Sequence, residues 1–109
     1  MNWNKIESTD QLAHITQESN GQPILLFKHS TRCSISSAAL ARLERSWVED
    51  NGIKPYYLDL LAYRPLSMEI AALFGVEHES PQALLISNGK CVYHESHMGI
   101  NVSDMLSVL

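Results

Sequence analysis

A run of four apolar residues followed by a helical pattern constrains the fold of this chain most strongly. Ile24–Phe27 is continuously apolar, as expected for a central strand that is covered on both faces. Between Ile35 and Trp47, apolar residues recur about one helical turn apart, and charged residues occupy the other faces. Tyr56–Leu60 then resumes a strand pattern rich in aromatic and apolar residues. The order strand, helix, strand predicts a βαβ unit and an α/β fold.

Local start and stop signals predict helices on both sides of this unit. Ser8–Gln11 reads as a capping box and predicts a first helix that ends at Asn20-Gly21. Asn51-Gly52 is expected to close the second helix. Pro65 suits the first turn of a third helix, which ends at Gly75.

The last third of the chain predicts a β-hairpin and a short helix. Asn88-Gly89 is the strongest two-residue hairpin signal, because both turn positions need positive φ, and it lies between strand patterns at 83–86 and 91–93. Ser103 is expected to cap a C-terminal helix. The whole order predicts a central mixed sheet flanked by helices, and it resembles the order of the thioredoxin fold.

Length and composition favour one domain, residues 1–109, without a nucleic-acid or membrane partner. The chain is 45% hydrophobic and 18% charged, which is ordinary for a globular protein. Its formal net charge of -4, without a Lys/Arg cluster, supplies little attraction for phosphate backbones or anionic lipid. No run approaches the ~20 apolar residues of a membrane span, and Met1–Lys5 has no signal-peptide pattern. We therefore expect a cytoplasmic protein; its oligomeric state stays open.

Cys33 is the strongest candidate for a reactive residue. It stands where the second helix is expected to begin, so it faces unsatisfied backbone N–H groups and the positive end of the helix dipole. Both favour thiolate, the nucleophile in disulfide exchange, and Arg32 adds positive charge beside it. The alternative is a small core cysteine, which the polar residues around Cys33 disfavour. The sequence therefore predicts a redox cysteine.

The spacing of polar residues after Cys33 predicts monothiol chemistry. A dithiol site would carry its second cysteine three residues on, where Ser36 stands. The stable oxidised form of Cys33 would then be a mixed disulfide with another molecule, which points to a low-molecular-weight thiol. Ser36 either donates a hydrogen bond to the Cys33 sulfur or is a common capping-region residue. Cys91 is expected about 20 Å away along the return strand, too far to resolve the disulfide, so we interpret it as structural.

The segment before the hairpin predicts a substrate contact. Ser80-Pro81 directly precedes a strand, where a cis-proline is expected to leave the Ser80 backbone free to pair with an extended substrate. The return strand brings His97 and Gly99 toward the same end, and Gly99 is expected to let a loop approach the substrate. His29, just before the nucleophile segment, is a candidate for proton transfer or charge balance. The five histidines lack the pairing that a metal site needs.

Three segments together resemble the monothiol bacilliredoxin family: Phe27–Ser37, His78–Ala83 and Ser96-His97. The resemblance covers nearly the whole chain and implies a thioredoxin-like bacterial protein that removes bacillithiol from client proteins. It implies that the residue corresponding to Cys33 attacks the bacillithiol sulfur, with bacillithiol as co-substrate and no tightly bound cofactor. Ser34 stands where the family often has proline, which should loosen the helix start without removing the nucleophile.

The resemblance leaves some points open. Bacillithiol bears carboxylates, so either Lys28 or Arg32 is expected to supply opposite charge. A glutathione-dependent monothiol glutaredoxin would run the same chemistry with another thiol. A non-enzymatic carrier would use Cys33 to hold an iron–sulfur cluster between two copies. A redox-dead interaction domain would keep the fold alone.

Overall fold

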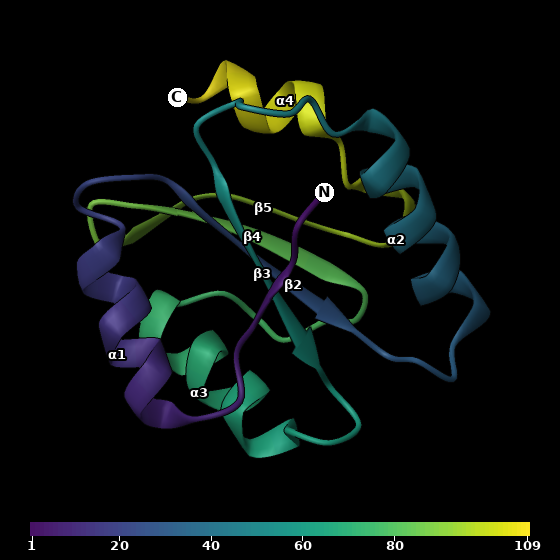
Figure 1. The fold of residues 1–109 in the computed structure, drawn as a ribbon. Coiled ribbons are helices and arrows are strands. Elements are labelled where there is room, and N and C mark those ends of the chain that lie inside the picture. The colour runs from purple at the N-terminus through teal and green to yellow at the C-terminus, as the bar shows by residue number, and fades with distance from the viewer.

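The computed structural model describes all 109 residues, and its centre is a five-stranded mixed sheet (Figure 1). The strand order is β1-β3-β2-β4-β5; β3 pairs in parallel with β1 and β2, whereas β4 is antiparallel to β2 and β5. The strands are β1 (Asn4–Lys5), β2 (Ile24–His29), β3 (Lys54–Asp59), β4 (Gln82–Ser87) and β5 (Lys90–Ser96). The predicted mixed sheet of an α/β fold is confirmed.

Helices cover both faces of the sheet. The helices are α1 (Thr9–Glu18), α2 (Ser34–Ser46), α3 (Arg64–Phe74) and α4 (Val102–Ser107), with a short 3-10 helix η1 (His97–Gly99). In Figure 1, α1 and α3 lie on one side of the strands, and α2 and α4 lie on the other. The two buried apolar clusters divide in the same way: one contains residues of α1 and α3, the other residues of α2 and α4. The sheet is therefore the middle of three layers.

Strand β2 is buried along its whole length, as its apolar run predicts. Ile24 and Leu26 belong to the α1/α3 cluster, while Leu25 and Phe27 belong to the α2/α4 cluster, because successive side chains point to opposite faces. The strand then continues into two polar residues, Lys28 and His29, which are also buried. Polar side chains at this end of the central strand need partners, and these partners shape the site described below.

The hairpin prediction is confirmed, whereas the expected end of the second helix is wrong. Asn88 and Gly89 have φ values of 52° and 76° and join β4 to β5. Helix α2 ends at Ser46 rather than at Asn51-Gly52, because Trp47 turns to an extended conformation and packs against the α2/α4 cluster. The residues between Trp47 and β3 form a loop in which Gly52 has a φ of 84°.

Two further predictions differ from the structure. The C-terminal helix is capped by Asn101 instead of Ser103: the Asn101 side chain accepts from Asp104 N–H at 3.1 Å, and asparagine caps as well as serine. This earlier start lets Val102 and Met105 face the core one turn apart. Strand β1 has no counterpart in the sequence prediction, because two exposed residues carry no alternating pattern; it is defined by its pairing with β3.

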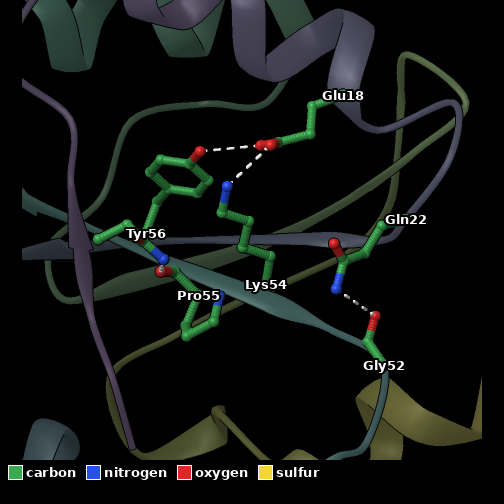
Figure 2. Close-up of polar contacts among 7 residues, drawn as sticks. Glu18, Gln22, Gly52, Lys54, Pro55 and Tyr56 are labelled. Carbon is green, nitrogen blue, oxygen red and sulfur yellow. Dashed lines mark hydrogen bonds and ion pairs between the residues drawn. The ribbon is translucent and has the colours of Figure 1, made fainter.

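One end of the sheet carries an ion pair between layers. Lys54 Nζ lies 2.8 Å from Glu18 Oε2, and Tyr56 donates its hydroxyl to Glu18 Oε1 at 2.8 Å (Figure 2). Glu18 ends α1 and Lys54 begins β3, so the contact ties a helix end to the sheet. We call these three residues the Glu18 clamp. No helix of the structure is long and apolar enough to cross a membrane.

Candidate active site

Cys33 is the N-cap residue of α2, where the chain turns from β2 into the helix. Its backbone N–H donates to Ser30 O at 3.1 Å, and its carbonyl accepts from Ser37 N–H at 3.0 Å. The backbone is extended at this residue, and the thiol makes no capping bond and is half-exposed. The N–H groups of residues 34–36 belong to the first turn and have no partner inside the helix. The thiol therefore combines solvent access with a helix N-terminus, which favours thiolate.

Ser36 and His29 form a buried pair behind Cys33. Ser36 is fully buried, and its hydroxyl accepts from Ser30 N–H at 3.0 Å and lies 2.6 Å from His29 Nδ1. The Ser36 hydroxyl therefore bonds to Ser30 and His29 and not to the Cys33 sulfur, and its predicted contact with substrate stays a prediction. Ser36 fixes the turn that presents Cys33.

The His29 ring lies among aromatic side chains. It stacks on Phe27 with centroids 6.0 Å apart and lies 5.5 Å from the Tyr57 ring. Burial lowers the pKa of His29, and the nearby Asp59 carboxylate offsets only part of this effect. Burial therefore favours the neutral ring, and its Nδ1 faces the Ser36 hydroxyl rather than solvent.

The segment that precedes β4 lies beside the end of β2. Gln82 pairs with Lys28. Pro81, which directly precedes Gln82, therefore lies at the same end of the sheet as the chain that leads from β2 to Cys33. The Ser80–Pro81 peptide bond is cis. The carbonyl of Pro81 accepts from His97 N–H at 3.0 Å, which brings η1 to this end of the sheet as well. The Ser80 N–H and carbonyl take part in none of the backbone hydrogen bonds of this region.

This segment also concentrates unsatisfied polar atoms. Three buried side-chain polar atoms have no hydrogen-bond partner, and two of them, Ser80 Oγ and Gln82 Oε1, flank Pro81. Buried polar groups are normally paired, and exceptions gather where a protein gives up local satisfaction for function. The end of the sheet where Cys33, Ser80 and Pro81 lie is therefore the best candidate site in the molecule.

The remaining predicted site residues differ in access. Arg32 and His97 are exposed next to Cys33 and Pro81 respectively. Gly99 is exposed at the end of η1, where a Cβ would come within 2.8 Å of the exposed Glu95 side chain. Lys28 is completely buried, so of the two cations predicted to face a substrate carboxylate only Arg32 is exposed.

Lys28 has interior partners that its place in the sequence does not reveal. Its Nζ donates to Ser67 O at 3.1 Å and lies 3.2 Å from His78 Nδ1, and Ser67 Oγ lies 3.1 Å from the same ring atom. We call Lys28, Ser67 and His78 the Lys28 cluster. The sequence holds one sign of these partners: Lys28 directly continues the apolar run of a buried strand. A lysine side chain at such a position must either reach solvent or find buried acceptors.

Cys91 lies at the other end of the sheet. It pairs with Ile86, which pairs with Ile24, the first residue of β2, whereas Cys33 follows the last residue. The length of β2, at ~3.3 Å per residue, alone places the two cysteines roughly 17 Å apart along the strand direction, well beyond disulfide reach. Burial raises the pKa of the Cys91 thiol, which donates to Tyr93 O at 3.2 Å. No group of three His, Cys, Asp or Glu side chains gathers closely enough to hold a metal ion.

The five-stranded mixed sheet with helices on both faces, and Cys33 at the start of α2, define a thioredoxin-like protein. Solved thioredoxins share the fold: that of Trypanosoma brucei brucei has a TM-score of 0.76 at 13% identity, with 98% of this chain and 87% of that chain covered. The thioredoxin of Fasciola hepatica has a TM-score of 0.70 at 18% identity, with coverages of 95% and 93%.

More specific matches define the family. A solved structure described as having a thioredoxin fold is 34% identical, with a TM-score of 0.82, and covers 95% of this chain and 90% of its own. The family model of the monothiol bacilliredoxin BrxC matches residues 4–105. The chain therefore belongs to the monothiol bacilliredoxin family, as the resemblance of its motifs predicts, and the family and fold support a redox role.

Proposed function

We propose that this protein is a monothiol oxidoreductase that removes bacillithiol from protein mixed disulfides in the bacterial cytoplasm. One observation carries the proposal: Cys33 is half-exposed at the start of α2, and the position of a resolving thiol is filled by the buried hydroxyl of Ser36. A nucleophile without a nearby second thiol passes its disulfide to a second molecule. Family membership supports bacillithiol as that molecule.

The reaction consists of two thiol–disulfide exchanges. In the first, the Cys33 thiolate attacks the bacillithiol sulfur; the bond between that sulfur and the client sulfur breaks, and the client leaves as a thiolate. In the second, the thiolate of another bacillithiol attacks the same sulfur, Cys33 leaves as a thiolate, and bacillithiol disulfide is released. Each step forms one disulfide bond and breaks one.

The exposed groups around Cys33 suggest how the substrate is held. Arg32 supplies a cation for the bacillithiol carboxylates, because Lys28 is buried and Arg32 is not. The free N–H and carbonyl of Ser80 pair with the extended client chain. His97 and Gly99 border this position through the contact between His97 and Pro81.

The proposal is tested by intact-mass analysis of the reduced protein mixed with a bacillithiol-modified client. We expect rapid release of the client and a bacillithiol adduct confined to Cys33. A glutathione-modified client run in parallel measures the choice of thiol, and a preference for glutathione would identify a monothiol glutaredoxin instead. If neither client is released, the protein is a cluster carrier or an inactive binding domain.

A further inference from the structure

The Lys28 cluster holds an ammonium in the interior without an opposite charge. Lys28 is completely buried, and its two hydrogen-bond partners, Ser67 O and His78 Nδ1, are neutral. The two ion pairs of the structure belong to other residues. Burial lowers the pKa of Lys28 to about 8, so the amine still carries a proton at pH 7. A buried cation with only neutral partners lowers the stability of the fold.

The amine is not needed to satisfy its neighbours. Ser67 lies inside α3, so its carbonyl has a helical partner four residues on. His78 Nδ1 also lies 3.1 Å from the Ser67 hydroxyl, which can donate to it. Removing the amine would therefore leave neither acceptor unpaired. Lys28 therefore lowers the stability of the fold, and no buried group depends on it for a hydrogen bond. Its role is then sought in the two segments that it connects.

Lys28 connects the central strand to the segment that carries Ser80. His78 belongs to the loop between α3 and β4, residues 75–81, and lies two residues before Ser80. The same loop is also held on both sides of His78, where Gln82 Nε2 donates to Glu77 O at 2.9 Å and Ser96 donates to Glu79. At His78 itself, the Ser67 hydroxyl ties the loop to α3 at 3.1 Å, and the bond from Lys28 is the contact that ties it to β2.

The charges around His78 keep this contact in place at neutral pH. Burial lowers the pKa of His78, the positive charges of Lys28 and Arg64 lower it further, and Glu79 partly offsets them. A neutral ring leaves Nδ1 free to accept from the ammonium, whereas a protonated ring would offer no acceptor.

We propose that Lys28 is a positioning residue for the client: its buried ammonium pins loop 75–81 through His78, and so holds the free Ser80 backbone where the client chain pairs. This inference rests on the proposed function, because it names the part of the same site that binds the protein portion of the substrate. Small thiol reagents, which reach Cys33 without using Ser80, do not depend on it.

The test compares Lys28→Met with Lys54→Met, a matched change on the neighbouring strand at the opposite end of the sheet. For Lys28→Met we expect a thermal midpoint raised by roughly 5 °C. Backbone 15N order parameters of residues 76–80 should fall from about 0.85 toward 0.6. The kcat/KM for client release should fall about tenfold or more. Alkylation of Cys33 by iodoacetamide should be unchanged. Lys54→Met should lower the midpoint and leave the other three values unchanged.

A second variant approaches the contact from its other end. His78→Phe removes the acceptor and should reproduce the mobile 76–80 segment and the slow client release.

Three results would overturn the inference. Order parameters in Lys28→Met equal to those of the wild type would show that the amine does not hold the loop. An equal loss in alkylation and client release would mean that the charge acts on Cys33 itself. A lowered midpoint or an unfolded Lys28→Met variant would make the amine a structural group. If the wild type releases no client at all, the proposed function fails, and the order parameters and midpoint still decide the role of Lys28.

Discussion

Lys28 and Cys33 lie at one end of the sheet and Lys54 and Cys91 at the other, and the two pairs have opposite surroundings. At one end, Cys33 is half-exposed at a helix start, and Lys28 is buried without a carboxylate. At the other, Cys91 donates to a backbone carbonyl, and Lys54 pairs with Glu18 (Figure 2). Burial lowers the pKa of Lys28, whereas the hydrogen bond to Glu18 raises that of Lys54.

Under our proposal, this contrast separates groups that stabilise the fold from groups that serve the active site. The Glu18 clamp pairs a cation with a carboxylate and a hydroxyl, so each member gains from folding. The Lys28 cluster and the unpaired atoms beside Pro81 gain little from it. Polar groups that are poorly satisfied in the native state are expected at functional sites and are offset elsewhere in the fold. Variants at matched positions of the two ends therefore sharpen or break the comparison.

The largest difference is expected between the two cysteines. Cys33→Ser should abolish client release, because serine is a far weaker nucleophile toward sulfur than thiolate. Cys91→Ser should leave the rate nearly unchanged, because its thiol lies at the far end of the sheet. Both rates are measured with the modified client by intact mass. Loss of activity in a folded Cys91→Ser variant would contradict the separation of the two ends.

The pH dependence of stability should distinguish the two lysines next. The pKa of Lys28 falls from 10.5 to about 8 on folding. Below pH 8 both states hold the proton; between about pH 8 and 10.5 only the unfolded state does, so stability rises with pH in this window. Relative to Lys28→Met, the wild type should gain up to about 3 kcal/mol across it. Denaturant unfolding at several pH values measures the difference, in which other titrating groups cancel; a flat difference would contradict it.

Removing the Ser36 hydroxyl should act on the active-site end alone. Ser36→Ala leaves Ser30 N–H and His29 Nδ1 without their common partner in a buried position. We expect a loss of about 1–3 kcal/mol in the free energy of unfolding, together with slower alkylation of Cys33, because the turn that presents the thiol is loosened. Ser37→Ala, at an exposed neighbouring position, is the control. Unchanged stability in Ser36→Ala would mean that water replaces the hydroxyl.

The sequence predicts this contrast only in part. Local patterns were sufficient for the apolar strand β2, the start of α2 at Cys33 and the hairpin at Asn88-Gly89, because each depends on residues close in the chain. The partners of Lys28 and Ser36 could not be predicted in this way. They depend on the pairing of β2 with β4 and on the packing of α3, which bring together residues far apart in sequence. Sequence motifs locate the candidate nucleophile, whereas tertiary contacts decide which polar neighbours reach solvent.

The smallest effect is expected at the Glu18 clamp. Burial alone would raise the pKa of Glu18, but hydrogen bonds from Lys54 and Tyr56 outweigh it, and the pKa lies below 4.5. The clamp therefore contributes stability that is present above about pH 4.5 and is lost as the pH falls through the lowered value. Glu18→Gln should cost about 1 kcal/mol at pH 7, and the difference from the wild type should vanish in acid.

Client release by Glu18→Gln should match the wild type, because the clamp lies at the end of the sheet away from Cys33. Denaturant unfolding from pH 7 down to pH 3 and the intact-mass assay check the two halves of this prediction. Slower client release by a Glu18→Gln variant that is as stable as the wild type would show that the two ends of the sheet are coupled. Lys54→Met would then no longer be a valid control for Lys28→Met.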